Sequence, residues 1–409
     1  MQFADFLLYL LAAAGNVALW AGFINRVHGT ALPRRPVRAL TALGVLGLVV
    51  SPLAVAIVGW QHEFRIIGRG DWDGVPWGLM FYVGLCAVGA PLMAGAWLVH
   101  RWQDRAAGTL LDERSRSYDL RAAALEGVES PAMQRLIQLR ANEASQLAVT
   151  HKTLYLARLP AELDRLTIAH LSDLHFTGRV GKQFFVEVVN RVNELDADLV
   201  ALTGDIVDKA RYLPWLPDTV QRLRARHGVY FVLGNHDLYV PTATLRDMLT
   251  SAGLVDLGSQ TATLELRGRR IALAGNELPW IGPPPDLSRL PADAALKIAL
   301  SHAADQFNWG RRHGFDLLLA GHNHGGQVRL PLLGALACPS RHGTRYACGV
   351  FYARPTVMHV SRGVSGEVPL RWNCAPEISL LTLAAARPTD EAAAAARQQD
   401  APELRYAPS

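Results

Sequence analysis

The chain of 409 residues is long enough for a sizeable folded domain and a further segment. Half of its residues are hydrophobic and the net charge is +5, which fits a domain held against anionic lipid headgroups. No run of interleaved arginine and aromatic residues is present, so we expect no nucleic-acid partner. Four cysteines are too few for a disulfide scaffold, and we expect free thiols in a reducing compartment.

Three stretches near the N-terminus, residues 6–24, 39–60 and 75–99, contain no charged residue. Each reaches the ~20 apolar residues that a helix needs to cross a bilayer. A cleaved signal peptide is the competing interpretation of the first stretch. It lacks the basic n-region of such peptides, because the only charge before it is Asp5. We therefore predict that residues 1–100 form three transmembrane helices.

The connections between these stretches differ in charge. The first connection, residues 25–38, contains four arginines and no acidic residue, whereas the second contains two arginines and three acidic residues. Positively charged short loops favour the cytoplasmic side. We therefore expect a multi-pass membrane protein whose first connection and whole C-terminal part lie in the cytoplasm. The arginines of the two connections are Arg26, Arg34, Arg35 and Arg38, and then Arg65 and Arg69.

The next segment, residues 101–147, is polar and rich in helix-forming residues. Ser130 and Pro131 are typical of an N-cap followed by proline at the first helical position. Apolar residues follow at helical spacing, which predicts a helical linker or a helix at the membrane interface. At the other end of the chain, residues 387–409 are rich in alanine, proline, glutamine and charges, which predicts a disordered tail.

Residues 148–386 alternate between short β-rich runs and helical patterns. Strands separated by helices predict an α/β fold with largely parallel pairing. Helical patterns occur at 182–195 and 219–226, and after Pro339 only strands and turns are expected. The expected strands are 148–157, 167–171, 199–203, 229–233, 270–274, 297–300, 317–320 and 378–383.

Polar motifs stand just after five of the expected strands. The carboxyl ends of strands in an α/β sheet form the crevice where ligands bind, so these motifs can converge. Glycines at 204, 234 and 321 allow tight turns where side chains crowd one point. The motifs are Asp173-Leu-His175, Gly204-Asp205, Gly234-Asn235-His236-Asp237, Ser301-His302 and Gly321-His322-Asn323-His324.

This mixture of side chains suits hydrolysis of a phosphate ester. The negative charge of the ester repels hydroxide, and two divalent cations ~3.5–4 Å apart neutralise it and acidify a bridging water. One carboxylate must bridge the two ions, and imidazole and oxygen ligands complete each shell. Asp, His and Asn without thiolate favour Mn, Fe or Zn. The sequence thus predicts a binuclear metal centre that hydrolyses a phosphoester.

The order of these motifs over residues 148–384 resembles the calcineurin-like metallophosphoesterases. Residues 168–175, 202–208, 228–237 and 321–331 are similar to the membrane-associated bacterial branch, which includes phosphodiesterases and UDP-2,3-diacylglucosamine pyrophosphatase-like enzymes. The resemblance implies a β-sandwich of two mixed sheets flanked by helices, here preceded by the all-α transmembrane region. It also implies a bacterial inner membrane as the location. Asn323 departs from the branch, which usually has threonine there.

The resemblance also implies a role for each motif residue. His236 would face the leaving group as a general acid or charge stabiliser, and either Asp208 or Asp237 would orient it. The expected ligands are Asp173, His175, Asp205 and His324 for one divalent ion, and the bridging Asp205 with Asn235, His302 and His322 for the other.

Three apolar loops, residues 212–217, 278–285 and 330–336, follow metal-motif strands. Exposed apolar loops often mark contact with a membrane or a ligand. We therefore hypothesise that these loops bind a lipid-linked phosphodiester or pyrophosphate. Packing of the loops on one another is the alternative. A broad-specificity tethered protein or nucleotide phosphatase is a second candidate function. A non-enzymatic membrane receptor or scaffold is a third, disfavoured by the intact ligand set. The sequence leaves the oligomeric state open.

Overall fold

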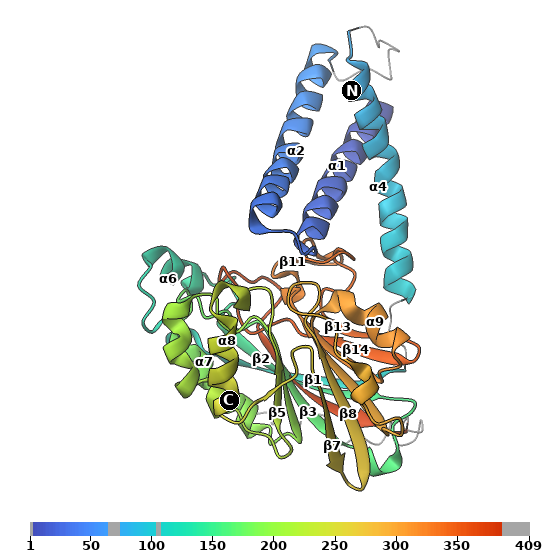
Figure 1. Cartoon of the computed structure of the whole chain (residues 1–409). Helices are drawn as coiled ribbons and strands as arrows, with labels where there is room; N and C mark the ends of the chain where they lie inside the picture. The colour runs from blue at the N-terminus through green and yellow to red at the C-terminus, as the bar shows by residue number, and fades with distance from the viewer. Residues whose placement is uncertain (1–2, 64–73, 104–107, 387–409) are drawn as a thin grey trace, which may run out of the picture.

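The computed structural model describes residues 3–63, 74–103 and 108–386. Three long helices project from one side of a domain built on two β-sheets (Figure 1). Arg65 and Arg69 of the second connection and the expected disordered tail, 387–409, lie outside the described residues.

The three helices are α1 (Phe3–His28), α2 (Arg34–Gln61) and α4 (Trp77–Gln103). Each is long and apolar enough to cross a membrane, which confirms the three predicted apolar helices and suggests a membrane anchor. Helix α1 packs against both α2 and α4, and most of the large apolar side chains on the three helices point outward. A helix that is apolar all round is suited to a lipid environment.

The first sheet has seven strands, of which the consecutive strands β3, β4, β5 and β6 are parallel. β15 runs antiparallel to β3 and parallel to β2. In spatial order the strands are β1 (Leu110–Asp119), β2 (Gln146–Tyr155), β15 (Glu377–Ala384), β3 (Thr167–Leu171), β4 (Leu199–Thr203), β5 (Val229–Val232) and β6 (Val255–Asp256).

The second sheet has six strands, with β14, β10, β9 and β8 parallel and an antiparallel strand at each edge. In spatial order these are β13 (Gly349–Ala353), β14 (Thr356–Val360), β10 (Leu317–Gly321), β9 (Leu296–Ala303), β8 (Arg269–Asn276) and β7 (Thr261–Leu266). Both sheets are therefore mixed, as expected.

The two sheets pack face to face and helices cover their outer faces. Along β4, Leu199 and Ala201 point into the core between the sheets, whereas Val200 and Leu202 face the helices. This alternation follows from the two-residue period of a strand. Short α5 (Arg121–Leu125), α6 (Pro131–Gln138), α7 (Lys182–Glu194) and α8 (Thr242–Ser251) accompany the first sheet, and α9 (Phe307–Arg312) covers the second.

Two segments differ from the expected secondary structure. Within 101–147, residues Leu110–Asp119 form the edge strand β1 and not a helix, although α6 begins at Pro131 as predicted. β1 is mostly exposed and is held by its main-chain ladder to β2, so it has no apolar periodicity. The helix expected at 219–226 is only a 3-10 turn at Val220–Arg222, which buried Val220 and Leu223 fix against the core.

Candidate metal centre

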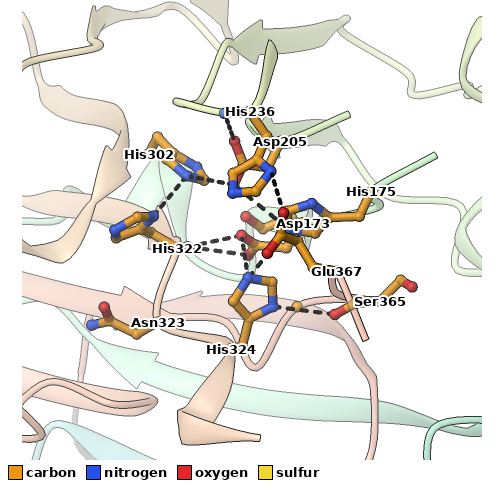
Figure 2. A network of polar contacts seen from close by, with 12 residues as sticks. Asp173, His175, Asp205, His236, His302, His322, Asn323, His324, Ser365 and Glu367 are labelled. Atoms are coloured by element: carbon orange, nitrogen blue, oxygen red, sulfur yellow. Dashed lines mark hydrogen bonds and ion pairs between the residues drawn. The ribbon is translucent and has the colours of Figure 1, made fainter. Parts of the chain in front are cut away.

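The motif residues meet at the carboxyl ends of the central strands of both sheets (Figure 2). Asp173, Asp205 and Asn235 follow β3, β4 and β5, and His322 follows β10. His302 is the exception, because β9 runs from Leu296 to Ala303 and His302 lies within it. The parallel order of these strands brings side chains that are far apart in sequence to one edge of the sandwich.

The backbone at the centre is held in an uncommon conformation. Five of the motif residues have positive φ angles, a region that costs non-glycine residues of order 1–3 kcal/mol each. Such residues cluster at functional sites, where surrounding hydrogen bonds fix them. One example is the amide of His322, which donates to both carboxylate oxygens of Asp173 at 3.0 and 3.1 Å. The five angles are 57° at Asp173, 51° at His175, 56° at Asp205, 70° at His322 and 49° at His324.

Two glycines are required by the close approach of neighbouring turns. A Cβ at Gly321 would lie 1.8 Å from Ser172 Oγ and 2.6 Å from Asp173 Oδ2. A Cβ at Gly204 would lie 2.6 Å from the Gly234 amide nitrogen. Any side chain at these positions would push the strand ends apart.

A first group contains Asp173, His175, Asp205 and His324, whose ligand atoms all lie within 4.8 Å of one another. The Nε2 atoms of His175 and His324 are 3.2 Å apart. Asp205 Oδ2 lies 3.5 Å from His175 Nε2, and Asp173 Oδ1 lies 3.6 Å from His324 Nε2. The structure thus brings together the four residues expected around one ion.

A second group contains Asp205, His302 and His322. His302 Nε2 lies 3.1 Å from Asp205 Oδ2 and 3.1 Å from His322 Nδ1. Asn235 comes just after β5, and its buried Oδ1 has no hydrogen-bond partner among the described residues. The same Asp205 oxygen faces both groups, which suits a bridging carboxylate.

Facing ring nitrogens in the first group need a cation between them. His175 Nδ1 lies 3.0 Å from Asp208 Oδ2, and His324 Nδ1 lies 3.1 Å from the Ser365 carbonyl oxygen. These oxygens accept, so each Nδ1 carries a hydrogen and each ring, in its neutral form, presents an Nε2 lone pair. The two lone pairs face each other, and this contact is favourable only with a proton or a metal ion between them.

The electrostatics of the centre also demand positive charge. Burial alone would lower the pKa of His175, but Asp208, Asp205 and Asp173 raise it to about 10. Burial opposes the charge of His302 in the same way, and chiefly Asp205 raises its pKa to about 9. Divalent ions supply such charge and displace the ring protons when they bind. Ligand nitrogens ~2.1 Å from one ion would also be roughly 3 Å apart, as these are. The residues present therefore fit a metal centre.

His236 stands at the edge of the first group, with its ring centroid 4.7 Å from that of His175. Its Nδ1 lies 2.5 Å from Asp208 Oδ1. Of the two candidates for orienting His236, Asp208 makes this contact. The Asp237 carboxylate instead accepts hydrogen bonds from four backbone amides, those of Asp205, Ile206, Val207 and Gly234.

Residues outside the motifs complete the surroundings of the centre. Trp280 packs its ring 4.6 Å from that of His322, centroid to centroid. The Thr203 carbonyl accepts from His302 Nδ1 at 2.7 Å, as the Ser365 carbonyl does from His324. No sequence signal marks a backbone carbonyl as a partner, whereas Trp280 belongs to an apolar loop that follows a strand. The four cysteines are free, as expected.

Comparison with known proteins places this fold and site in a family. Residues 166–326 match the calcineurin-like phosphoesterase family model. The chain is 30% identical over 257 residues to the metallophosphoesterase YkuE of Bacillus subtilis, covering 59% of this chain and 87% of that protein. It is 31% identical over 225 residues to phosphodiesterase YaeI of Escherichia coli, covering 53% and 81% respectively.

A third relative is a transmembrane protein with a metallophosphoesterase domain from Bos taurus. It is 29% identical over 267 residues, which span 60% of this chain and 59% of that protein. The chain belongs to the calcineurin-like metallophosphoesterase family. It is accordingly a metal-dependent phosphoester hydrolase, whose family uses a divalent metal centre.

Proposed function

We propose that the protein is a membrane-anchored binuclear phosphodiesterase or pyrophosphatase that acts on a lipid-linked substrate. The observation that carries the proposal is the pair of ligand groups that share Asp205 (Figure 2), because His324 of the first group lines one pocket together with the end of α1. Asp173, His175, Asp205 and His324 would hold one ion. Asp205, Asn235, His302 and His322 would hold the other.

In the proposed reaction, divalent ions at these positions supply the charge that binds the phosphate oxygens and acidifies the attacking water. Asp208 accepts from His236 Nδ1, so Nε2 is the nitrogen that is free to face the leaving oxygen. His236 would then donate a proton to that oxygen as its bond to phosphorus breaks. Asp208 also fixes the His175 ring and thus couples the proton donor to the ligand shell.

Two of the three apolar loops support a lipid-linked substrate. The 330–336 loop is the hairpin β11–β12 (Arg329–Leu330 and Gly334–Ala335), and Leu332 and Leu333 at its tip are 89% and 54% exposed. Figure 1 shows this hairpin at the base of the three helices. Trp280 in the 278–285 loop donates a hydrogen bond to the Thr30 carbonyl just after α1, at 3.2 Å.

The 212–217 loop supports the alternative of packing. Leu216 is buried, and Tyr212 and Trp215 lie against the helix-side core of the first sheet. Trp215 contacts Phe176 and Phe185, with ring centroids 5.6 and 6.1 Å away. This loop therefore stabilises the domain and does not support lipid binding.

Placement in a bacterial inner membrane with three spans and a cytoplasmic catalytic domain is part of the proposal. The arginine-rich first connection supports it. A tethered phosphatase for soluble nucleotides or proteins is the competing function. A phosphatase for soluble substrates would not need the exposed Leu332 and Leu333 beside the apolar helices.

The test uses the full-length protein in lipid nanodiscs, stripped by a chelator and reloaded with Mn, Fe or Zn. We expect two metal equivalents per chain and turnover of UDP-2,3-diacylglucosamine well above that of bis(4-nitrophenyl) phosphate. His236→Ala should keep both ions and lose roughly 10²–10⁴-fold in kcat. A single bound equivalent would contradict the binuclear centre, and equal turnover of the two substrates would contradict the lipid-linked substrate.

A further inference from the structure

The C-terminal end of α1 lies against the metal centre. Asn25 Oδ1 accepts from the Cys338 amide at 3.1 Å, and the Gly29 carbonyl accepts from Arg341 Nε at 3.3 Å. Just beyond α1, the Thr30 carbonyl accepts from Trp280, whose ring packs on His322. Three hydrogen bonds thus join the helix end to loops that surround the catalytic residues.

This junction is tightly packed. A Cβ at Gly29 would lie 2.5 Å from the Arg341 amide nitrogen and 2.7 Å from the Ser340 carbonyl carbon. Ser340 and Arg341 are in turn held by Asp305. Its carboxylate accepts from Ser340 Oγ at 2.5 Å and from the Arg341 amide at 3.0 Å. The end of α1 is therefore an integral wall of the catalytic domain and more than a flexible tether.

A pocket of about 260 Å³ lies between this helix end and the metal centre. One wall comes from α1 and the other from the last metal motif and the segment after it. Since His324 belongs to the first ligand group, a substituent of a phosphoester bound at the centre can reach this pocket. The helix wall consists of Ile24, Asn25 and His28, and the catalytic wall includes Asn323, His324 and Gln327.

The lining of the pocket combines polar and apolar side chains. Polar Asn25, His28 and Gln327 lie with His324, whereas Ile24 begins the apolar part of α1 that leads away from the domain. Farther along α1, on the same helix face as Ile24, Val17 is 56% exposed. A ligand that follows this wall needs a polar end at the metal centre and an alkyl chain beyond it.

The leaving group belongs on the other side. Figure 2 shows His236 and His324 on opposite sides of Asp173, with His175 contacting both histidines. If His236 protonates the leaving oxygen, the pocket beside His324 receives the substituent that stays on phosphorus. We propose that the end of α1 determines substrate specificity by binding the alkyl chain of this non-leaving group. The inference rests on the proposed function, because it assigns to α1 the recognition of the amphiphilic substrate.

The test uses two probes with one leaving group, dodecyl 4-nitrophenyl phosphate and methyl 4-nitrophenyl phosphate. The metal-loaded full chain is assayed in phosphatidylcholine nanodiscs, and metal content is measured for each variant. We expect the wild type to prefer the dodecyl ester by about tenfold or more in kcat/KM, because its pocket contacts only the longer chain. Ile24→Trp, which fills the pocket, should abolish this preference by slowing hydrolysis of the dodecyl ester far more than that of the methyl ester.

Leu19→Trp is the matched control, because it adds the same ring to an exposed position of the same helix. It should leave the preference unchanged. Ile24→Ala adds no bulk and should also lower the preference, which keeps the test decisive if Ile24→Trp disturbs folding or metal content.

Three results would overturn the inference. The wild type could show no chain-length preference, both Ile24 variants could retain the preference, or Leu19→Trp could abolish it as fully as Ile24→Trp. A metal-loaded wild type that hydrolyses neither ester would instead overturn the proposed phosphodiesterase function, and the inference with it. The two failures are therefore distinguishable in one experiment.

Discussion

The Asp208 carboxylate contacts two imidazoles with different proposed tasks. It accepts from His175 Nδ1 at 3.0 Å and from His236 Nδ1 at 2.5 Å. Burial alone would raise the pKa of Asp208, but the two histidines lower it well below its ordinary value, so it is ionised. The ionised carboxylate of Asp208 has two accepting oxygens, one for the Nδ1–H group of each histidine.

Asp208→Asn should therefore lower kcat strongly. The amide keeps one accepting oxygen and turns an NH₂ group toward the other ring, so one histidine loses its orientation. We expect a roughly 10–100-fold loss, as for other residues that orient metal ligands. Steady-state kinetics with metal analysis checks this. Asp218→Asn, at an exposed ion pair with Lys182, is the control and should behave as wild type. Equal activity of the two variants would remove Asp208 from the mechanism.

The sequence predicted most of the individual residues that meet at the metal centre. Asp173, Asp205 and His322 follow strands whose runs of β-branched and apolar residues are evident, so their convergence could be expected. The partner of His236 could not be chosen, because Asp208 and Asp237 are both near in sequence and only the turn geometry separates them. Trp280 and the end of α1 join the site through long-range contacts that no local pattern encodes.

Among the elements, β2, β3, β14 and β15 share a buried polar network between the sheets. Glu377 pairs with Lys152 and, at 2.9 Å, with Arg362 Nε. Lys152 also contacts His359 Nε2 at 3.1 Å, whose Nδ1 lies 2.8 Å from His170. Both histidines are fully buried. The cross-sheet partners that satisfy them could not be predicted, because strand pairing is not local.

Glu377→Gln should destabilise the protein by about 3–5 kcal/mol, because it leaves buried cations without their counter-ion. Burial alone would raise the pKa of Glu377, but Lys152 and Arg362 hold it well below its ordinary value of 4.5. Its charge therefore stabilises the fold above pH 4.5, and this contribution is lost as pH falls through the lower folded-state pKa.

Thermal unfolding in detergent at several pH values measures this effect. The difference in Tm between wild type and Glu377→Gln should be largest near neutral pH and should shrink below pH 4.5. The exposed Glu265→Gln serves as the control. A difference in Tm that is constant down to low pH would show that the charge of Glu377 does not stabilise the fold.

For the molecule as a whole, the sequence predicted an apolar helical part and a separate α/β domain. Uncharged stretches identify the three long apolar helices, and alternating strands and helices identify the sandwich. Neither signal says how the parts meet. The junction at Gly29 depends on a single missing side chain and on partners more than 300 residues away, at Cys338 and Arg341.

Gly29→Ala should therefore weaken the junction between α1 and the catalytic domain. The added Cβ would lie 2.5 Å from a backbone nitrogen of Arg341, so α1 must move and the bond from the Cys338 amide to Asn25 is weakened. Losing a bond worth about 1 kcal/mol should speed hydrogen exchange at Cys338 roughly fivefold, which mass spectrometry of the full chain in nanodiscs measures.

Gly89→Ala is the matched control for this change. Gly89 lies within α4 and a Cβ there meets nothing within 4 Å, so exchange at Cys338 should stay as in wild type. Because the junction joins α1 to the walls of the metal centre, Gly29→Ala should also slow hydrolysis of dodecyl 4-nitrophenyl phosphate more than Gly89→Ala does. Unchanged exchange and turnover in both variants would mean that the catalytic domain works independently of α1, and that the membrane helices serve only as an anchor.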